Sequence, residues 1–297
     1  MRVLVTGATG MLGHALLPVL SLSHQVTGVG VEDFDIRDED AVRATFAAHD
    51  PELVLHLAAY TNVDGCETDP QTAEETNGTG TRIVAEACGE IGAAMLYVGT
   101  DYVFDGGQAE PYSERDHPNP INAYGRSKLL GEQYVQSVLD RHFIARTSWL
   151  FGPNGRNFVT TILDLADQQE VLRVVNDQRG SPTYTRHLAL KLLDIVEMGA
   201  YAIYHITGSG SCSWFEFAQS IVELWPIRGA RVIPISTAES GRAARRPANS
   251  VLENQRLRLM HMALLPHWKS ALAEYLDELK RRGLAEDLKQ SQDGNKA

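Results

Sequence analysis

The architecture follows from residues 2–20, RVLVTGATGMLGHALLPVL. Residues 2–6 are a short, mostly apolar run, and Met11 to Leu20 place apolar side chains at helical spacing. Gly7 and Gly10 stand between these two runs and Gly13 lies in the second, in the pattern G-x-x-G-x-x-G. The first glycine permits a tight turn, the second lets the main chain approach a pyrophosphate, and the third allows close helix–strand packing. The segment therefore predicts a strand, a turn and a helix whose N-terminus binds the phosphates of a dinucleotide.

The alternation of strand and helix continues through the first half of the chain. Strand-like runs and intervening helical patterns occur at 25–30, 39–48, 53–57, 71–90, 93–100, 122–140 and 143–149. Strands separated by amphipathic helices are typical of a parallel sheet with right-handed crossovers. Residues 1–150 are therefore predicted to form an α/β, doubly wound parallel sheet of the Rossmann type.

The second half of the chain is less regular. After Trp149, loop-rich stretches interrupt shorter elements, so residues 151–282 are predicted to form a smaller substrate-binding lobe with segments that return to the Rossmann core. Helical patterns and one more strand are expected there, at 185–198, 213–225, 267–282 and 200–208. The polar residues 283–297 are expected to fray.

Composition restricts the class of protein. The chain has 297 residues, 43% of them hydrophobic, which is enough to build a large core. Its 27 basic against 38 acidic residues give a net charge of -11, which argues against a nucleic-acid partner. Cys66, Cys88 and Cys212 lie far apart, so we expect reduced thiols and no metal site. No apolar run approaches ~18 residues, so we expect a cytoplasmic protein without membrane contact.

The choice between NADPH and NADH stays open. Gly30 and Val31 occupy the end of the second strand, where an acidic residue would hold the adenosine ribose, and no Arg stands there for a 2′-phosphate. Asp35 and Ile36 either flank the adenine or begin the next helix, for which Asp38 is a suitable cap. The remaining predicted cofactor contacts lie in and after the glycine turn, at Thr9, Met11 and Leu12.

Three side chains suggest a reduction chemistry. Tyr124 and Lys128 are four residues apart in a predicted helix, so they share one face. A phenol can donate a proton to a ketone that accepts hydride, and a nearby ammonium lowers the pKa of that phenol and can bind the nicotinamide ribose. Thr100 ends the strand at 93–100, where its hydroxyl can reach the ketone. The structural alternatives are a surface Tyr–Lys pair and a capping Thr.

Longer blocks resemble a known family. They are GTDYVFDGG at 99–107, PYSERDHPNPINAYGRSKLLGE at 111–132, RTSWLFG at 146–152, QRGSPTYTRHLA at 178–189, YHITGSGSCSWFEFA at 204–218 and RPANSVLEN at 246–254. Together with the glycine turn they resemble the extended short-chain dehydrogenase/reductase family, and within it the dTDP-4-dehydrorhamnose reductases. The last three blocks lie outside the nucleotide fold, so they indicate a sugar nucleotide.

The resemblance implies roles for individual residues. It places the catalytic Thr, Tyr and Lys on Thr100, Tyr124 and Lys128. It implies cofactor contacts from Ala58, Ala59 and Tyr60. It implies substrate contacts from Val63, Asp101, Trp149, Arg179 and Ser181, with Asp105, Gly106 and Pro182 near them. Core packing is the alternative for Trp149. Arg179 is the favoured diphosphate contact, with an ion pair as the alternative, and Arg245 and Arg246 form a second basic spot, with a solvated turn as the alternative.

The implied reaction uses NADPH or NADH to reduce the C4 ketone of dTDP-6-deoxy-L-lyxo-4-hexulose to dTDP-L-rhamnose. The resemblance also implies a homodimer. Two alternatives remain: a non-catalytic NADP-binding subunit like the methionine adenosyltransferase β subunit, and a related sugar-nucleotide reductase or epimerase. The chain departs from the family pattern at Gly99, where Ser is common, and at Gly65-Cys66.

Overall fold

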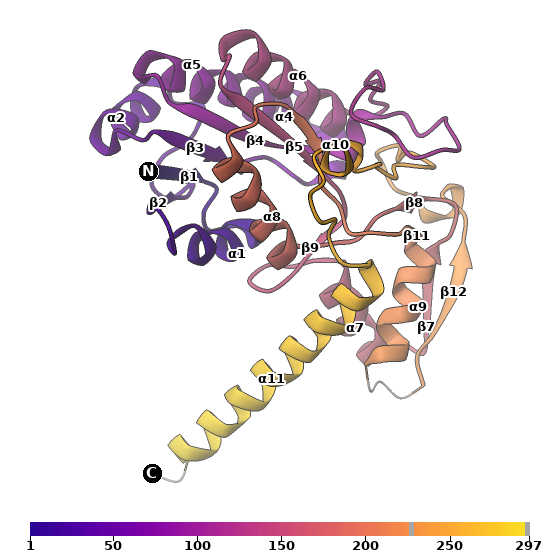
Figure 1. Cartoon of the computed structure of the whole chain (residues 1–297). Coiled ribbons are helices and arrows are strands. Elements are labelled where there is room, and N and C mark those ends of the chain that lie inside the picture. The colour runs from indigo at the N-terminus through magenta and orange to yellow at the C-terminus, as the bar shows by residue number, and fades with distance from the viewer. Residues whose placement is uncertain (226–228, 295–297) are drawn as a thin grey trace.

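The central feature of the fold is a parallel sheet (Figure 1). The computed structural model describes residues 1–225 and 229–294, with side chains to residue 283. Within these residues, six strands pair in the order β10-β5-β4-β3-β1-β2, all parallel. Their bounds are β1 (Arg2–Thr6), β2 (Gln25–Val29), β3 (Leu53–His56), β4 (Ala94–Thr100), β5 (His142–Thr147) and β10 (Ile203–His205). The predicted doubly wound parallel sheet is confirmed.

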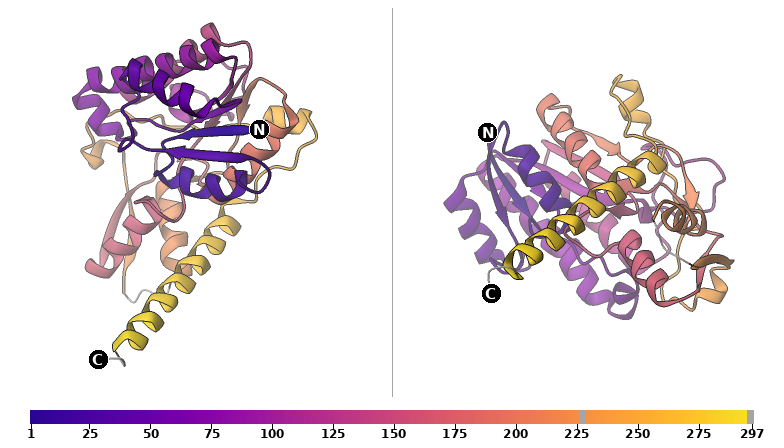
Figure 2. Two further views of the ribbon diagram at one scale, coloured as in Figure 1. Left: turned by 90° about the vertical axis from the view of Figure 1, so that its left-hand side faces the viewer. Right: turned by 90° about the horizontal axis from the view of Figure 1, so that it is seen from below.

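Helices cover both faces of this sheet (Figure 2, left). Successive strand residues point to opposite faces, so Val3 and Val5 pack on one side while Leu4 packs on the other. The first side is covered by α1 (Met11–Leu20), α8 (Thr185–Met198) and α10 (Gln255–Leu259). The second side is covered by α2 (Glu39–His49), α5 (Thr81–Ile91) and α6 (Ala123–Val138). Three segments that follow residue 150, namely β10, α8 and α10, thus belong to the sheet and its helical layer.

The helical pattern at 71–90 proves to be discontinuous. Two short helices, α3 (Val63–Thr68) and α4 (Pro70–Glu74), precede a π-helical turn, η1 (Glu75–Gly80), and α5 follows it. Asn77 in this turn accepts a hydrogen bond from Tyr60 N (2.7 Å) and donates to Tyr60 O (3.0 Å). The π-helical turn therefore places the Asn77 side chain against the loop after β3, and such turns occur frequently at functional sites.

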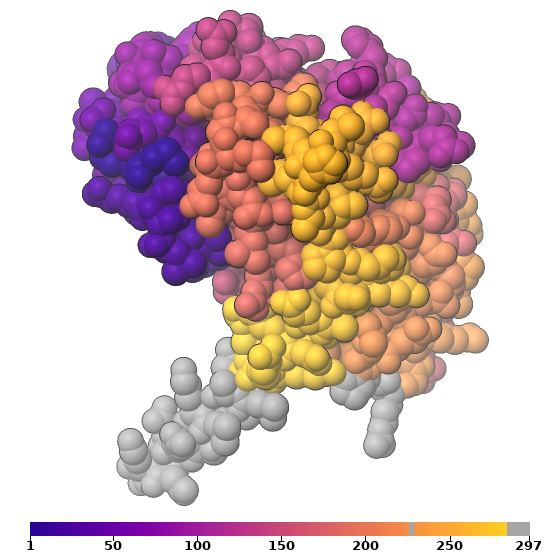
Figure 3. Space-filling model, viewed as in Figure 1, coloured from indigo at the N-terminus to yellow at the C-terminus, as the bar shows by residue number. Residues whose placement is uncertain are grey.

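A second unit lies beside the sheet, in the lower right part of Figure 1. It contains α7 (Phe158–Gln168), α9 (Trp214–Leu224) and the parallel pair β7 (Val171–Val175) and β12 (Arg231–Ile235). Shorter strands pair β6 (Leu150–Phe151) with β9 (Thr183–Tyr184) and β8 (Arg179–Gly180) with β11 (Cys212–Ser213). An aromatic core holds it together, formed by Phe151, Tyr184, Phe217, Trp268 and Tyr275. In Figure 3 the yellow and orange segments lie together in the lower part of the molecule, and salmon segments separate them from the indigo N-terminal part.

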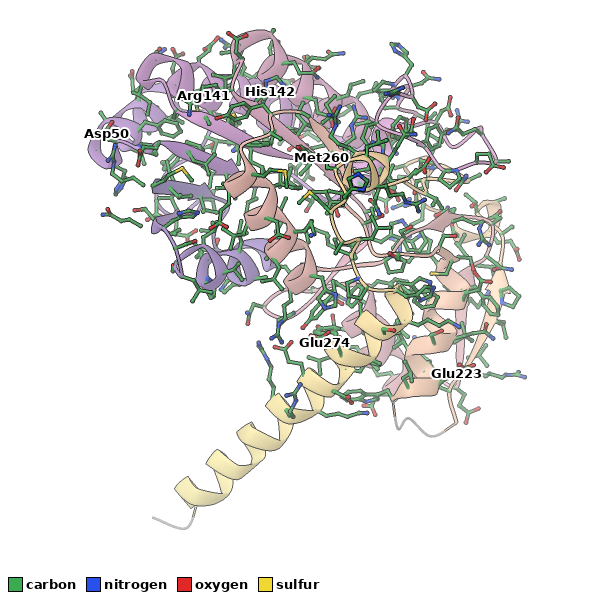
Figure 4. The ribbon with its side chains drawn as sticks, in the orientation of Figure 1. Asp50, Arg141, His142, Glu223, Met260 and Glu274 are labelled. Atoms are coloured by element: carbon green, nitrogen blue, oxygen red, sulfur yellow. The ribbon has the colours of Figure 1, made fainter. Side chains whose placement is uncertain are left out.

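The last helix, α11 (Trp268–Gly294), joins the two units. Glu274, labelled on this helix in Figure 4, accepts a hydrogen bond from His187 of α8 (2.9 Å) and lies 3.6 Å from the guanidinium group of Arg186. Within the segment expected to fray, 283–297, α11 continues as far as Gly294, and residues 295–297 lie outside the described residues. No helix in the described part combines the length and hydropathy needed to cross a membrane.

Candidate active site

A cavity of 1320 Å³ opens over the carboxyl ends of the strands. The chain proceeds from β1 to β2 on one side and returns to β3 on the other, so the sheet has its switch point between β1 and β3, where open α/β sheets bind ligands. Loops after β1, β3, β4 and β5 line one wall. Side chains from α7, β7 and α9 line the opposite wall. The cavity therefore lies between the sheet and the second unit.

Close steric contacts explain why the turn after β1 contains glycines. Gly7 has φ +67°, and a Cβ there would lie 2.6 Å from Ala58 N. A Cβ at Gly13 would lie 2.3 Å from Ala8 O, so α1 approaches β1 only because position 13 has no side chain. No described side chain caps α1 at Gly10. The first amides of this helix thus remain available to an anion at the cavity.

Tyr124, Lys128 and Thr100 converge on the same cavity. Asn122 starts α6 by accepting a hydrogen bond from Gly125 N (2.8 Å), which places the phenol and the ammonium one helical turn apart. Thr100 ends β4 and donates a hydrogen bond to Asp101 Oδ1 (3.1 Å). Burial raises the pKa of Tyr124 above its ordinary value, while a hydrogen bond with Thr100 lowers it. The phenol is therefore protonated at neutral pH.

Several buried polar groups at the cavity have no protein partner. Asp101 Oδ2 and Thr147 Oγ1 are buried and have no hydrogen-bond partner among the described residues. Lys128 is 4% exposed and forms no salt bridge within the described part of the chain. Buried polar groups in folded proteins nearly always have a hydrogen-bond partner, so each unpaired group needs an explanation such as a catalytic role or a bound water or ion. The open glycine cradle and these groups fit a dinucleotide and a polar substrate.

The predicted adenine contacts lie at the far end of the cavity. Asp35 and Ile36 both line it, and Asp38 caps α2 by accepting a hydrogen bond from Ala41 N (3.1 Å). Sequence reasoning missed Arg37, which also lines the cavity and pairs with Asp35 (2.6 Å). Because this arginine lies beyond the end of β2, the strand-end pattern did not include it.

The sequence and the fold of this chain are similar to those of known proteins. The family model described as RmlD substrate binding domain matches residues 1–281. The chain belongs to this family. A dTDP-4-dehydrorhamnose reductase of Streptomyces griseus is 41% identical over 284 residues, which cover 92% of each chain. The solved dTDP-4-dehydrorhamnose reductase of Clostridium acetobutylicum is 40% identical, with a TM-score of 0.92 over 94% of this chain and 100% of that chain. The Bacillus anthracis reductase, solved in complex with NADP, is 39% identical, with a TM-score of 0.91 over 93% and 99%.

The RmlD-family residues expected around the substrate divide into two groups. Val63, Asp101 and Trp149 line the cavity, as do Ala58, Ala59 and Tyr60 on the cofactor side. Arg179 and Ser181 are absent from the described lining residues. Arg179 is half-exposed and lies near Ser211 (3.4 Å) and Glu216 (3.8 Å), while Ser181 is buried and donates to Gly210 O (2.8 Å).

Trp149 packs on the segment that carries these two residues. A Cβ at Gly180 would lie 2.3 Å from the Trp149 ring, so the ring packs directly on the backbone of Gly180. Trp149 itself has φ +48° and stacks on Trp214 with ring centroids 3.4 Å apart. Trp214 also lines the cavity, and sequence reasoning did not assign it a site role.

Two arginines reach the cavity where Arg179 does not. Arg242 and Arg246 both line it. Asp64, at the start of α3, accepts hydrogen bonds from Arg246 (3.0 and 3.1 Å) and Arg242 (3.2 Å). Burial alone would raise the pKa of Asp64, but hydrogen bonds from Arg246 and Ala244 lower it to about 2. Of the two residues in the second basic spot of the sequence, Arg246 lines the cavity, whereas Arg245 is exposed and is not among the described lining residues.

Proposed function

We propose that this chain uses NADPH or NADH to reduce the C4 ketone of dTDP-6-deoxy-L-lyxo-4-hexulose to dTDP-L-rhamnose. The observation that supports this most directly is the convergence of Thr100, Tyr124 and Lys128 on a cavity whose other end is the open glycine turn. Family membership supports the same reaction class, because the solved relative from Bacillus anthracis is a reductase in complex with NADP.

The side chains have distinct roles in the proposed reaction. The dinucleotide, when bound, supplies the hydride. With substrate bound, the Thr100 hydroxyl donates its hydrogen bond to the ketone oxygen instead of to Asp101 Oδ1, and Tyr124 transfers its proton to that oxygen as negative charge develops. Lys128 binds the nicotinamide ribose, and its positive charge opposes the rise in the phenol pKa that burial causes. The raised pKa of Tyr124 keeps the phenol in the acid form that reduction requires.

The rest of the substrate lies in the same cavity, next to the cofactor. The sugar lies beside Val63, Asp101 and Trp149, and its diphosphate binds Arg242 and Arg246. These two guanidinium groups line the cavity, whereas Arg179 does not, and guanidinium groups bind phosphate oxygens in bidentate geometry. Asp64 holds both arginines in place before the diphosphate arrives.

The deciding experiment follows the absorbance of the reduced nicotinamide with enzymatically prepared 4-keto nucleotide sugar, using NADPH and NADH in parallel. We expect one cofactor oxidised per product formed, and dTDP-L-rhamnose as the product by NMR. An epimerase would regenerate its cofactor and show no net loss of absorbance. A non-catalytic subunit would bind cofactor without turnover. A product with another configuration at C4 would reassign the substrate and keep the reaction class.

A further inference from the structure

We propose that Tyr97 is a positioning residue that holds the Lys128 ammonium on the face of its aromatic ring. The inference rests on the proposed function, in which Lys128 binds the cofactor ribose. An aromatic face attracts a cation without accepting directed hydrogen bonds as a carboxylate does. The N–H groups of Lys128 thereby remain available to a ligand at the cavity.

Tyr97 contacts both the side chain and the backbone of Lys128. Lys128 Nζ lies 4.1 Å from the centroid of the Tyr97 ring. The Tyr97 hydroxyl donates a hydrogen bond to the backbone oxygen of the same lysine (3.1 Å). A Cβ at Gly131 would lie 2.6 Å from the Tyr97 hydroxyl, so this close approach of α6 to β4 depends on a glycine.

The ring has little freedom to move. Tyr97 is fully buried on β4 and stacks on His56 of β3, with centroids 5.9 Å apart and planes 26° apart. His56 contacts Thr6 (2.7 Å) and Thr81 (3.2 Å) through its two ring nitrogens. Burial, followed by the charge of Lys128, lowers the pKa of His56 to about 3, so the imidazole behind the ring is neutral.

The carboxylate nearest to Lys128 along α6 is paired with an arginine, so Tyr97 is the group that contacts the ammonium. Glu132, four residues after Lys128 on α6, is fully buried and accepts hydrogen bonds from Arg146 of β5 (2.7 and 3.1 Å). Tyr124, one turn earlier on α6, is the proposed acid. Burial lowers the pKa of Lys128 to about 7, and the charge of Glu132 opposes this change. Like the charge of Glu132, the face of the Tyr97 ring raises the pKa of Lys128, because it stabilises the charged amine.

The test separates the electrostatics of the ring from its shape. The matched variants are Tyr97→Phe, which keeps the aromatic face, and Tyr97→3,4,5-trifluorophenylalanine, which has a similar shape but lacks the negative face. Both lose the hydroxyl, so its hydrogen bond does not differ between them. The pKa of Lys128 is read by NMR of lysine labelled with ¹³C at Cε. The sequence has six lysines, and a Lys128→Met variant identifies the signal.

We expect Tyr97→Phe to keep the wild-type pKa of Lys128 and the trifluorinated variant to lower it by about 0.5–1.5 units. Since the ammonium then deprotonates at lower pH, the alkaline limb of kcat/KM should move down by the same amount, with thermal melting temperatures alike. Equal Lys128 pKa values in the two variants would overturn the proposal. A fully active Lys128→Met enzyme would instead contradict the proposed function, so the two failures are distinguishable.

Discussion

The Tyr124 phenol is the proton donor of the proposed reaction. Tyr124→Phe should lower kcat by about 10²–10⁴, because the general acid is lost while the ring and its contacts remain. NADPH binding, measured by fluorescence titration, should not change. Tyr134→Phe on the same helix is the matched control, since Tyr134 is not among the described residues that line the cavity. Unchanged turnover in Tyr124→Phe would contradict the assignment.

Asp101 should make the stability of the protein depend on pH. Burial raises its pKa from 3.8 to about 7, against hydrogen bonds from Ser250 and Thr100 that lower it. Between these two values the folded protein holds the Asp101 proton more tightly than the unfolded chain. Stability from this group is therefore present at low pH and is lost as the pH rises through that window.

Replacing Asp101 by Asn tests this dependence, because an amide does not titrate. Urea unfolding at pH 5 and pH 8 should show a smaller loss of free energy of unfolding in Asp101→Asn than in the wild type, by about 1–3 kcal/mol. Equal losses in the two proteins would mean that Asp101 titrates at its ordinary value. Asp105→Asn is the control, since hydrogen bonds from Gly107, Tyr112 and Asn119 lower the pKa of Asp105 instead.

The first helix depends on a glycine where it meets β1. Gly13→Ala would place a Cβ 2.3 Å from Ala8 O, so α1 must move away from the turn that precedes it. We expect the free energy of unfolding to fall by about 1–3 kcal/mol and the Kd for NADPH to rise at least tenfold.

Gly89→Ala in α5 is the matched control for that substitution. Its Cβ would lie 3.6 Å from the nearest side-chain atom, an ordinary contact. The free energy of unfolding of this variant should rise by about 0.5–1 kcal/mol, because Ala has a better helix propensity than Gly, and its Kd for NADPH should not change. Calorimetric titration with NADPH and denaturant unfolding measure both effects. Similar losses in the two variants would argue against close packing as the reason for Gly13.

Segments far apart in the chain complete the cavity between the sheet and the second unit. Arg246→Met should weaken binding of dTDP about 10–100-fold, since a charge-assisted contact to the diphosphate is lost. Thymidine, which lacks the diphosphate, should bind alike to both proteins. Arg179→Met is the control and should leave the Kd for dTDP unchanged, because Arg179 is absent from the described lining residues. If Arg179→Met weakened dTDP binding and Arg246→Met did not, the diphosphate contact would belong to Arg179.

The parts of this protein that could be predicted from its sequence depend on near neighbours in the chain. The turn at 7–13, the alternation of strands and helices, and the Tyr124–Lys128 spacing follow from local sterics and helical periodicity. The break at 75–80 was missed because the helical pattern continues on both sides of it. The ribbon of β7 and β12 was missed because its strands are separated by α8, β10 and α9.

Sequence spacing thus established the Rossmann architecture and its candidate acid, since both arise from contacts within one strand, turn or helix. Folding alone brought Asp64 to Arg246, Lys128 to Tyr97 and Trp149 to Trp214, and it placed Arg179 beside Glu216. The reason is that such pairs are dozens of residues apart, and their distance depends on how helices and strands pack on one another. No local periodicity encodes that packing.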